Sequence, residues 1–208
     1  MNTYKTADLS GAEWISTGGA CCTPMIRKTL SFPKVTSAKI TIAGLGIFEI
    51  FINGKKVSDD LFLPLSTDFH ERPEKLYRGV TYDEKMRHRL YCPVYDITSY
   101  LKEGENTIAF LMGPGWYEMP NECYEYGHIK LCYVIDWQDE KGETHRTGSD
   151  GSHKWKESYV KKANLLKGAV HDYRDYDETW MQTPYDDSDR AAVCLATAPE
   201  THFSIPAR

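Results

Sequence analysis

Short hydrophobic segments that alternate with polar residues limit the fold of this chain more than any other sequence feature. From Met25 to Phe32 successive side chains change sides, which is the period of a β-strand. The segment Ile47–Ile52 is rich in β-branched and aromatic residues, and Asn53-Gly54 follows it directly. Both turn residues tolerate positive φ, so this pair favours a tight two-residue hairpin. The sequence therefore predicts paired antiparallel strands.

The rest of the chain repeats this pattern and gives little sign of helix. Gly44–Gly46 is expected to form a turn, and Ser99–Lys102 is the one candidate for a turn of helix. About eight or nine short strands without a crossover helix are typical of an all-β fold, an antiparallel β-sandwich or jelly roll. Further predicted strands are Ala38–Ala43, Leu90–Ile97 with Pro93 at an edge or bulge, Thr107–Met112, Ile129–Trp137, Glu143–Arg146 and Val193–Ala196.

Charge and hydropathy exclude two classes of partner. The net charge is -5 and the 25 Lys and Arg residues are scattered, whereas nucleic-acid binding needs a concentrated basic surface. Residues 1–20 contain no apolar run of the length that a signal peptide requires, and no stretch of the chain is long enough for a membrane span. We therefore expect either a cytoplasmic protein or a chain from which a leader has been removed, and in both cases one that binds neither nucleic acid nor membrane.

The cysteines do not form a metal or redox motif. No pair has the spacing of a zinc knuckle or of C-x-x-C, so free thiols in a reducing compartment are expected. Cys132 and Cys194 both stand in apolar runs and are predicted to be small buried residues. The six cysteines are Cys21, Cys22, Cys92, Cys123, Cys132 and Cys194.

Two segments interrupt the strand pattern and are candidates for function. Residues 72–89 are charged and irregular, and residues 116–127 gather aromatic rings beside amide and carboxylate groups. An aromatic ring can cover the C–H face of a sugar while fixed polar groups bind its hydroxyls. The alternative is that Trp116 and Tyr117 are core residues that close one end of the sandwich. The candidate carbohydrate-binding residues are Trp116, Tyr117, Asn121, Glu122, Tyr124, Asp68 and His70.

The acidic runs carry no recognised catalytic or metal motif. Residues 172–178 and 186–189 are interpreted as solvated loops, and a calcium site is the alternative because calcium takes several oxygen ligands. Neither run has the spacing of a helical calcium loop, and the chain has no nucleophile elbow or phosphate-binding glycine loop. The sequence thus predicts no catalytic residue and no cofactor, with calcium left open.

A series of short fragments occurs in the order and spacing of one family. The fragments are Ala12–Ile15, Arg27–Phe32, Gly44–Glu49, Ile52–Val57, Leu63–Pro64, Ser66–Phe69, Tyr95–Thr98, Gly104–Asn106, Gly113–Tyr117 and Asp186–Ser188. Each alone has an ordinary structural explanation, such as a turn glycine. Together, over about residues 12–197, they resemble the N-terminal accessory β-sandwich domain of bacterial α-L-rhamnosidases. The resemblance implies a galactose-binding-domain-like sandwich.

The resemblance also implies that catalysis takes place in a domain other than the sandwich. In that family the two carboxyl groups of inverting hydrolysis lie in an (α/α)6 barrel beyond the sandwich. We therefore expect one sandwich domain at residues 1–198 with an inserted loop at 72–89, and a linker at 199–208 toward an absent catalytic domain. The chain alone is not expected to be an enzyme, although its parent is expected to be a glycoside hydrolase. Its partners would be a rhamnose-containing carbohydrate and the barrel.

The chain departs from the family pattern at positions that support a second hypothesis. Pro114 stands where a small polar or acidic residue is common, and Ala169 stands where an acidic residue usually follows the glycine. Some relatives bind rhamnose with calcium, but their ligands do not map onto this sequence. The alternative function is therefore a purely structural domain that packs against the barrel or in a homodimer.

Overall fold

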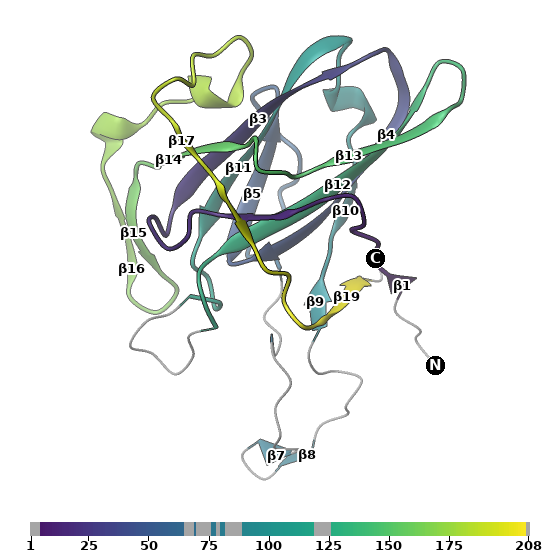
Figure 1. The fold of residues 1–208 in the computed structure, drawn as a ribbon. Coiled ribbons are helices and arrows are strands. Elements are labelled where there is room, and N and C mark those ends of the chain that lie inside the picture. Colours follow the sequence, from purple (N-terminus) through teal and green to yellow (C-terminus); the bar gives the residue numbers. More distant parts are fainter. Residues whose placement is uncertain are drawn as a thin grey trace.

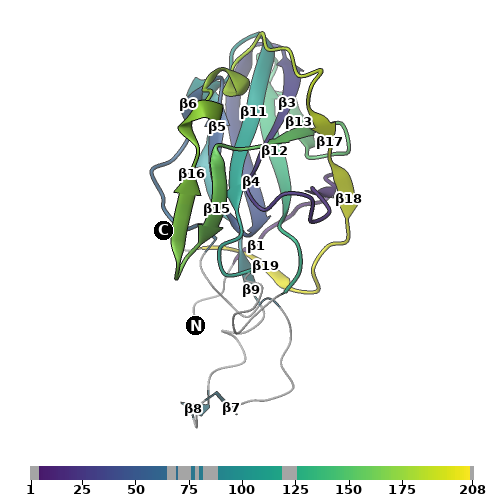
Figure 2. The same cartoon turned by 90° about the vertical axis from the view of Figure 1, so that its left-hand side faces the viewer.

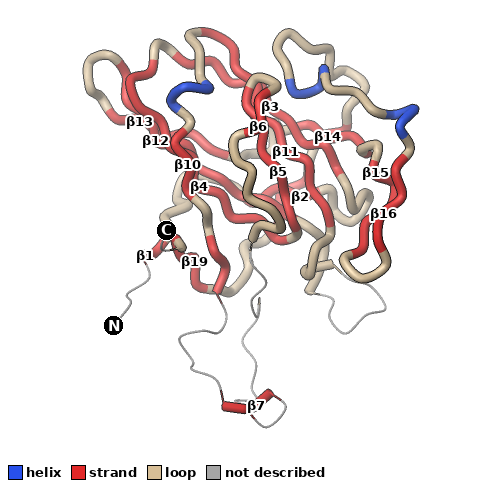
Figure 3. Tube along the Cα trace, turned by 180° about the vertical axis from the view of Figure 1, so that it is seen from behind, coloured by secondary structure: helices blue, strands red, loops and turns tan. Residues whose placement is uncertain are grey.

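Two antiparallel sheets face each other across one hydrophobic core. The structure is a computed structural model that describes residues 5–64, 69, 76–77, 80–81, 89–118 and 126–206. Over these residues the chain forms strands and short 3-10 turns, without an α-helix (Figure 3). Within the same ranges, no helix has the length and apolar character that crossing a membrane requires. The predicted all-β sandwich is confirmed.

The first sheet is built around the longest predicted strand. Its order is β10-β4-β12-β2-β18, and β13 also pairs with β12, all antiparallel. Figure 1 shows β12 running beside β4 and β13. The bounds are β2 Trp14–Ser16, β4 Val35–Leu45, β10 Val94–Asp96, β12 Lys130–Asp139, β13 Thr144–Gly148 and β18 Cys194–Ala196.

The second sheet contains the predicted hairpin. Its order is β17-β14-β3-β11-β5-β6. Asn53 and Gly54 both have positive φ, 51° and 79°, and they join β5 to β6 with Ile52 opposite Lys55. The Asn-Gly turn is therefore confirmed. The bounds are β3 Pro24–Phe32, β5 Ile47–Ile52, β6 Lys55–Lys56, β11 Gly104–Gly113, β14 Lys154–Glu157 and β17 Ala191–Ala192.

Smaller elements flank the two sheets. β9 (Arg89–Tyr91) pairs in parallel with β19 (His202–Ile205), and β19 pairs with β1 (Lys5–Thr6). The segment expected to be a linker from residue 199 thus contains a paired strand. The remaining elements are β7 Leu76–Tyr77, β8 Val80–Thr81, β15 Val160–Asn164, β16 Gly168–His171, η2 Thr98–Tyr100, η3 Tyr173–Asp175 and η4 Thr179–Met181.

The core contains the inward side chains of both sheets. Phe110 of β11 and Tyr133 of β12 are fully buried, and their ring centroids lie 5.2 Å apart across the sandwich. Along β5 the residues Phe48, Ile50 and Ile52 point into this core. Their alternation with half-exposed neighbours follows from the two-residue period of a strand.

Three local expectations are wrong. The predicted strand Leu90–Ile97 is divided between β9 and β10, because Pro93 lacks the N–H that a continuous ladder needs. Gly44 and Leu45 belong to β4, so Gly46 alone makes the corner between the sheets. Cys194 is exposed, since β18 is an edge strand and the adjacent Val193 takes the buried position.

The outer face of the second sheet is also covered. Met25 and Ala109 pack against the buried Trp180, which belongs to residues 172–190, here called the C-terminal arm. Arg27, on the same face of β3 as Met25, is only 1% exposed. Burial on both faces of β3 was not apparent from its alternating pattern.

We expect Gly46→Ala to lower the free energy of unfolding by about 3 kcal/mol, because it combines a positive φ with a steric clash. Gly46 has φ 109°, and an added Cβ would lie 2.6 Å from the carbonyl oxygen of Gly113. Gly104→Ala is the matched control, since its φ is also positive, 86°, but its Cβ would meet nothing within 4 Å. Urea unfolding compares the two variants, and equal losses would contradict the clash.

Candidate functional site

Three aromatic rings fasten two segments to one end of the sandwich. Phe69 packs edge-on against Tyr117 and Tyr126, with ring centroids 5.2 and 5.1 Å apart, and the two tyrosines stack at 5.9 Å. We call Phe69, Tyr117 and Tyr126 the aromatic corner. Tyr117 is 2% exposed, and burial raises its pKa to about 12. The aromatic corner is therefore a rigid support for the residues next to it. The ring of Tyr117 itself is buried in this packing.

Trp116 projects from this corner on a tight turn. The backbone N–H groups of Tyr117 and Glu118 both donate to the carbonyl oxygen of Pro114, at 3.2 Å each. Gly115 adopts φ 55°, which allows the chain to reverse within this turn. Trp116 is 42% exposed. The turn thus leaves the Trp116 side chain partly exposed, next in sequence to the buried Tyr117.

Glu118 fixes the start of the next segment. One carboxylate oxygen accepts from the backbone N–H of Ile129 at 3.0 Å, and the other lies 3.0 Å from Nδ1 of His128. The backbone N–H of Tyr126 donates to the carbonyl oxygen of Tyr117, also at 3.0 Å. The two ends of the 119–125 segment are therefore held together at the aromatic corner.

The predicted site residues divide into two groups. Trp116 is exposed and Tyr117 is part of the core, so the two neighbours have different environments. Phe69, which was not among the predicted site residues, packs against Tyr117 of the Trp116 turn. Asp68, His70, Asn121, Glu122 and Tyr124 lie outside the described residues.

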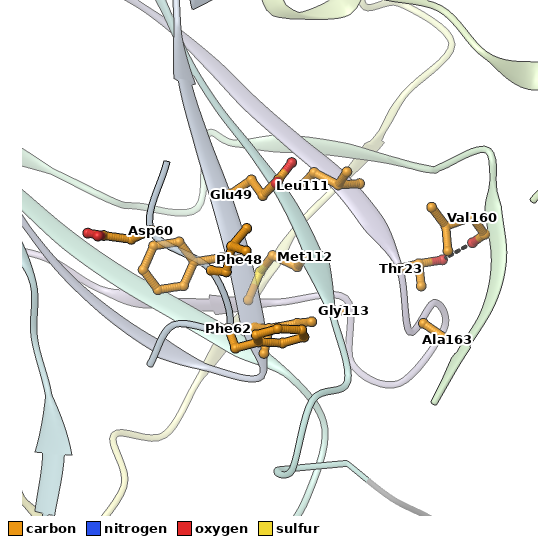
Figure 4. Close-up of a pocket in the computed structure, with 12 residues that line it drawn as sticks. Thr23, Phe48, Glu49, Asp60, Phe62, Leu111, Met112, Gly113, Val160 and Ala163 are labelled. Carbon is orange, nitrogen blue, oxygen red and sulfur yellow. Dashed lines mark hydrogen bonds between the residues drawn. The ribbon is translucent and has the colours of Figure 1, made fainter. Parts of the chain in front are cut away.

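An apolar groove adjoins this end of the second sheet (Figure 4). It has a volume of about 210 Å³, and Leu61 and Phe62 on its rim are largely exposed. Asp60 accepts a hydrogen bond from the Tyr95 hydroxyl at 2.9 Å, which holds the rim segment to β10. The groove is lined by Thr23, Ile47, Phe48, Glu49, Asp60, Leu61, Phe62, Leu111, Met112, Gly113, Val160 and Ala163. The groove was not predicted from the sequence, although two large apolar residues in succession, Leu61 and Phe62, indicated an apolar surface there.

Basic residues neutralise part of the acidic runs. Asp187 contacts Arg27 at 2.7 Å and Lys154 at 2.8 Å, and these cations lower the pKa of its carboxyl group. Asp175 contacts Lys161 at 2.8 Å. The solvated-loop interpretation is therefore incomplete, because Asp187 anchors the C-terminal arm to the sheet.

One side-chain group among the described residues has metal-ligand spacing. Asp139, Glu143 and His145 place one ligand atom each within 4.8 Å of one another. Asp139 accepts from the backbone N–H groups of Lys141 and Glu143, and it contacts His145 at 3.2 Å. These contacts cap the β12–β13 hairpin. A set that includes a histidine nitrogen also differs from the oxygen ligands that calcium takes.

Two facing sheets with an aromatic corner at one end define a β-sandwich domain, a scaffold of the kind that can present binding groups. The model of the α-L-rhamnosidase N-terminal domain family matches residues 33–207, and the chain belongs to this family. The resemblance predicted from the sequence fragments is thus confirmed.

Curated relatives are much longer than this chain. An α-L-rhamnosidase from Streptomyces avermitilis is 26% identical over 172 residues, which cover 79% of this chain and 15% of the relative. One from Formosa agariphila is 29% identical over 178 residues, covering 80% and 17%. The chain therefore spans less than a fifth of the length of these relatives.

Solved structures agree on the fold. An α-L-rhamnosidase from Dictyoglumus thermophilum superposes with a TM-score of 0.77 at 24% identity, covering 95% of this chain and 22% of that one. The Streptomyces avermitilis enzyme, solved in complex with L-rhamnose, gives 0.75 at 25% identity, covering 89% and 17%. A lectin from Pleurotus ostreatus matches at 0.57 and 14% identity, covering 99% and 48%, a likeness of fold alone.

Proposed function

We propose that this domain binds a rhamnose-containing carbohydrate at the aromatic corner, as a non-catalytic part of an α-L-rhamnosidase. The observation that carries the proposal is the packing of Phe69, which lies between the predicted site residues Asp68 and His70 in the sequence, on Tyr117 and Tyr126, next to the partly exposed Trp116. A rigid base with an exposed aromatic ring suits sugar recognition, because little conformational entropy is lost on binding. Hydrolysis would be carried out elsewhere in the longer polypeptide.

Trp116 would supply the apolar contact. Its ring can cover the C–H face of a deoxy sugar such as rhamnose, which carries a methyl group in place of a hydroxymethyl group. The polar contacts would come from side chains near the corner in the sequence, where Glu118 fixes the backbone of Ile129. Support for rhamnose as the sugar comes from membership in the family and from the rhamnose complex of the Streptomyces avermitilis relative.

We expect Trp116→Ala to weaken binding of L-rhamnose about tenfold, because one stacking contact of about 1 kcal/mol is lost together with its buried area. Isothermal titration calorimetry with and without calcium measures the change. Trp116→Phe is the matched control, since it keeps an aromatic face and should retain most of the affinity. Binding that is equal in wild type and Trp116→Ala would contradict the assignment.

The apolar groove favours a second candidate function, that of packing against another part of the polypeptide. Its exposed Leu61 and Phe62 extend the largely apolar lining, and isolated soluble domains rarely leave such surface without a partner. The curated relatives are much longer than this chain. We therefore propose a further domain of the same α-L-rhamnosidase as the partner that packs on the groove.

Hydrogen exchange would test this packing. In a longer polypeptide that contains the domain, we expect the amides of residues 60–63 and 111–113 to exchange at least about tenfold more slowly than in the isolated domain. Residues 141–143, in the turn between β12 and β13, serve as the internal control and should exchange equally in both. Equal exchange at the groove would contradict the packing function.

A further inference from the structure

A second concave site lies on the outer face of the second sheet, between the C-terminal arm and strands β5 and β6, with Tyr159, which directly precedes the β15–β16 hairpin, at its side. Figure 2 shows this hairpin beside β5 and β11, with the arm continuing from it. The cavity has a volume of about 300 Å³, at the lower end of the range for small-molecule sites. We call it the tyrosine furrow, and the side chains important here are Glu49, Lys56, Tyr159, Tyr176, Glu178 and Gln182.

An exposed group of tyrosines borders the furrow. The ring centroids of Tyr159 and Tyr176 lie 5.0 Å apart, those of Tyr159 and Tyr173 5.7 Å, and those of Tyr173 and Tyr176 6.0 Å. Tyr173 is 69% exposed and Tyr176 is 47% exposed. In the folded domain much of this aromatic surface therefore remains in contact with water. Three adjacent rings of this kind could cover a ligand.

Hydrogen bonds and ion pairs hold both sides of the furrow. On one side the backbone N–H of Asp172 donates to the carbonyl oxygen of Tyr159 at 2.8 Å, and Lys161 pairs with Asp175 at 2.8 Å. On the other side Arg27 donates to the carbonyl oxygen of Gln182 at 3.2 Å. The rings and polar groups are therefore positioned before any ligand arrives, which lowers the entropic cost of binding.

The polar groups of the furrow suit hydroxyl groups. Glu49 pairs with Lys56 at 2.5 Å, and the Tyr176 hydroxyl donates to Glu178. Each carboxylate has two oxygens that can accept several hydrogen bonds, so this pairing leaves capacity for a ligand. Within the described part of the chain, the side-chain amide of Gln182 makes no hydrogen bond of its own.

We infer that the tyrosine furrow binds a neutral saccharide, at a site separate from the aromatic corner. Aromatic faces with carboxylate and amide groups match the C–H surfaces and hydroxyls of a sugar ring. Glu49, Asp177 and Glu178 outnumber Lys56 along the lining, which disfavours uronates and phosphorylated or sulfated ligands. The same lining would attract a cation, so a cationic probe is included in the test below. The inference does not depend on rhamnose binding at Trp116.

NMR spectra of protein with isotope-labelled tyrosine rings test the inference directly. The probes are L-rhamnose, D-galactose and D-glucose, with D-galacturonate and choline as charged comparisons. We expect at least one neutral sugar to cause saturable shifts in the ring signals of Tyr159, Tyr173 and Tyr176, while the charged probes leave them unchanged. No saturable shift with any neutral sugar, or shifts with a charged probe alone, would overturn the inference.

Variants separate this site from the aromatic corner. Tyr176→Ala and Glu178→Gln should each weaken the saturable response about tenfold, whereas Tyr176→Phe should keep the stacking contribution. Trp116→Ala should leave the tyrosine response unchanged even if it abolishes binding at the corner. A response that persists unaltered in both Tyr176→Ala and Glu178→Gln would overturn the assignment to the furrow.

Discussion

Replacing Arg27 with methionine is expected to lower the free energy of unfolding by about 3–5 kcal/mol, the range for breaking a buried ion pair. Its guanidinium donates to the carbonyl oxygen of Trp180 at 2.9 Å, to Asp187 at 2.7 Å and to the hydroxyl of Thr107 at 3.2 Å. Methionine fills part of the volume but donates no hydrogen bond. The carbonyl of Trp180 would then lose its donor, and the C-terminal arm would lose the hydrogen bonds that Arg27 of β3 makes with it.

Lys156→Met is the matched control for Arg27→Met. Lys156 pairs with Asp189 at 2.5 Å, but both side chains are about half exposed, and exposed pairs contribute about 1 kcal/mol or less. Urea unfolding followed by tryptophan fluorescence compares the two variants. If Arg27→Met costs no more than Lys156→Met, Arg27 is not the anchor of the arm.

Lowering the pH from 7 to 4 is expected to destabilise the domain by about 2–3 kcal/mol through His153 alone. His153 is fully buried, and burial lowers its pKa from 6.5 to about 4. The charge of Lys28 acts in the same direction, while hydrogen bonding to Asp150 opposes it. Between the two pKa values the unfolded chain binds the proton and the folded chain does not. The contribution is therefore complete above about pH 6.5 and is lost as the pH falls toward 4.

The contacts of His153 are those of a neutral ring. Nδ1 donates to the carbonyl oxygen of Asp150 at 2.9 Å, so Nε2 is free to accept from the hydroxyl of Tyr133, also at 2.9 Å. Protonation would make Nε2 a donor, so the Tyr133 hydroxyl would have to change from donor to acceptor while a charge is placed inside the core.

His153→Gln tests this assignment. We expect it to flatten the loss of stability between pH 6.5 and 4, as measured by urea unfolding at several pH values. Asp8, whose pKa is lowered to about 2, gives an internal comparison, because the stability that it contributes is lost only below about pH 4. A variant with the same slope as wild type above pH 4 would contradict the role of His153.

The strands were predictable because their signals are local. Alternation marks β3, and Asn53-Gly54 marks the hairpin, each within a few residues. The environment of Arg27 was not predictable, because its partners Trp180 and Asp187 are more than 150 residues away in the sequence. A charged residue on the polar side of an alternating strand normally faces solvent. Here a later segment covers it.

The candidate site was predictable only where its residues lie close together in the sequence. The aromatic residues near Trp116 stand out in the sequence, but nothing local indicates that Phe69 packs on Tyr117. The run at residues 172–178 reads as a solvated acidic loop. Its tyrosines become a candidate site only because the β15–β16 hairpin brings Tyr159 beside Tyr176 and the cavity above β5.

The central claim is that the aromatic corner holds a carbohydrate site, and backbone amide NMR during a titration with L-rhamnose tests it most directly. We predict saturable shifts at the amides of residues 115–118 and 126–129, around the Trp116 turn and the carboxylate of Glu118. A spectrum that stays unchanged there at a high concentration of the sugar would contradict the claim.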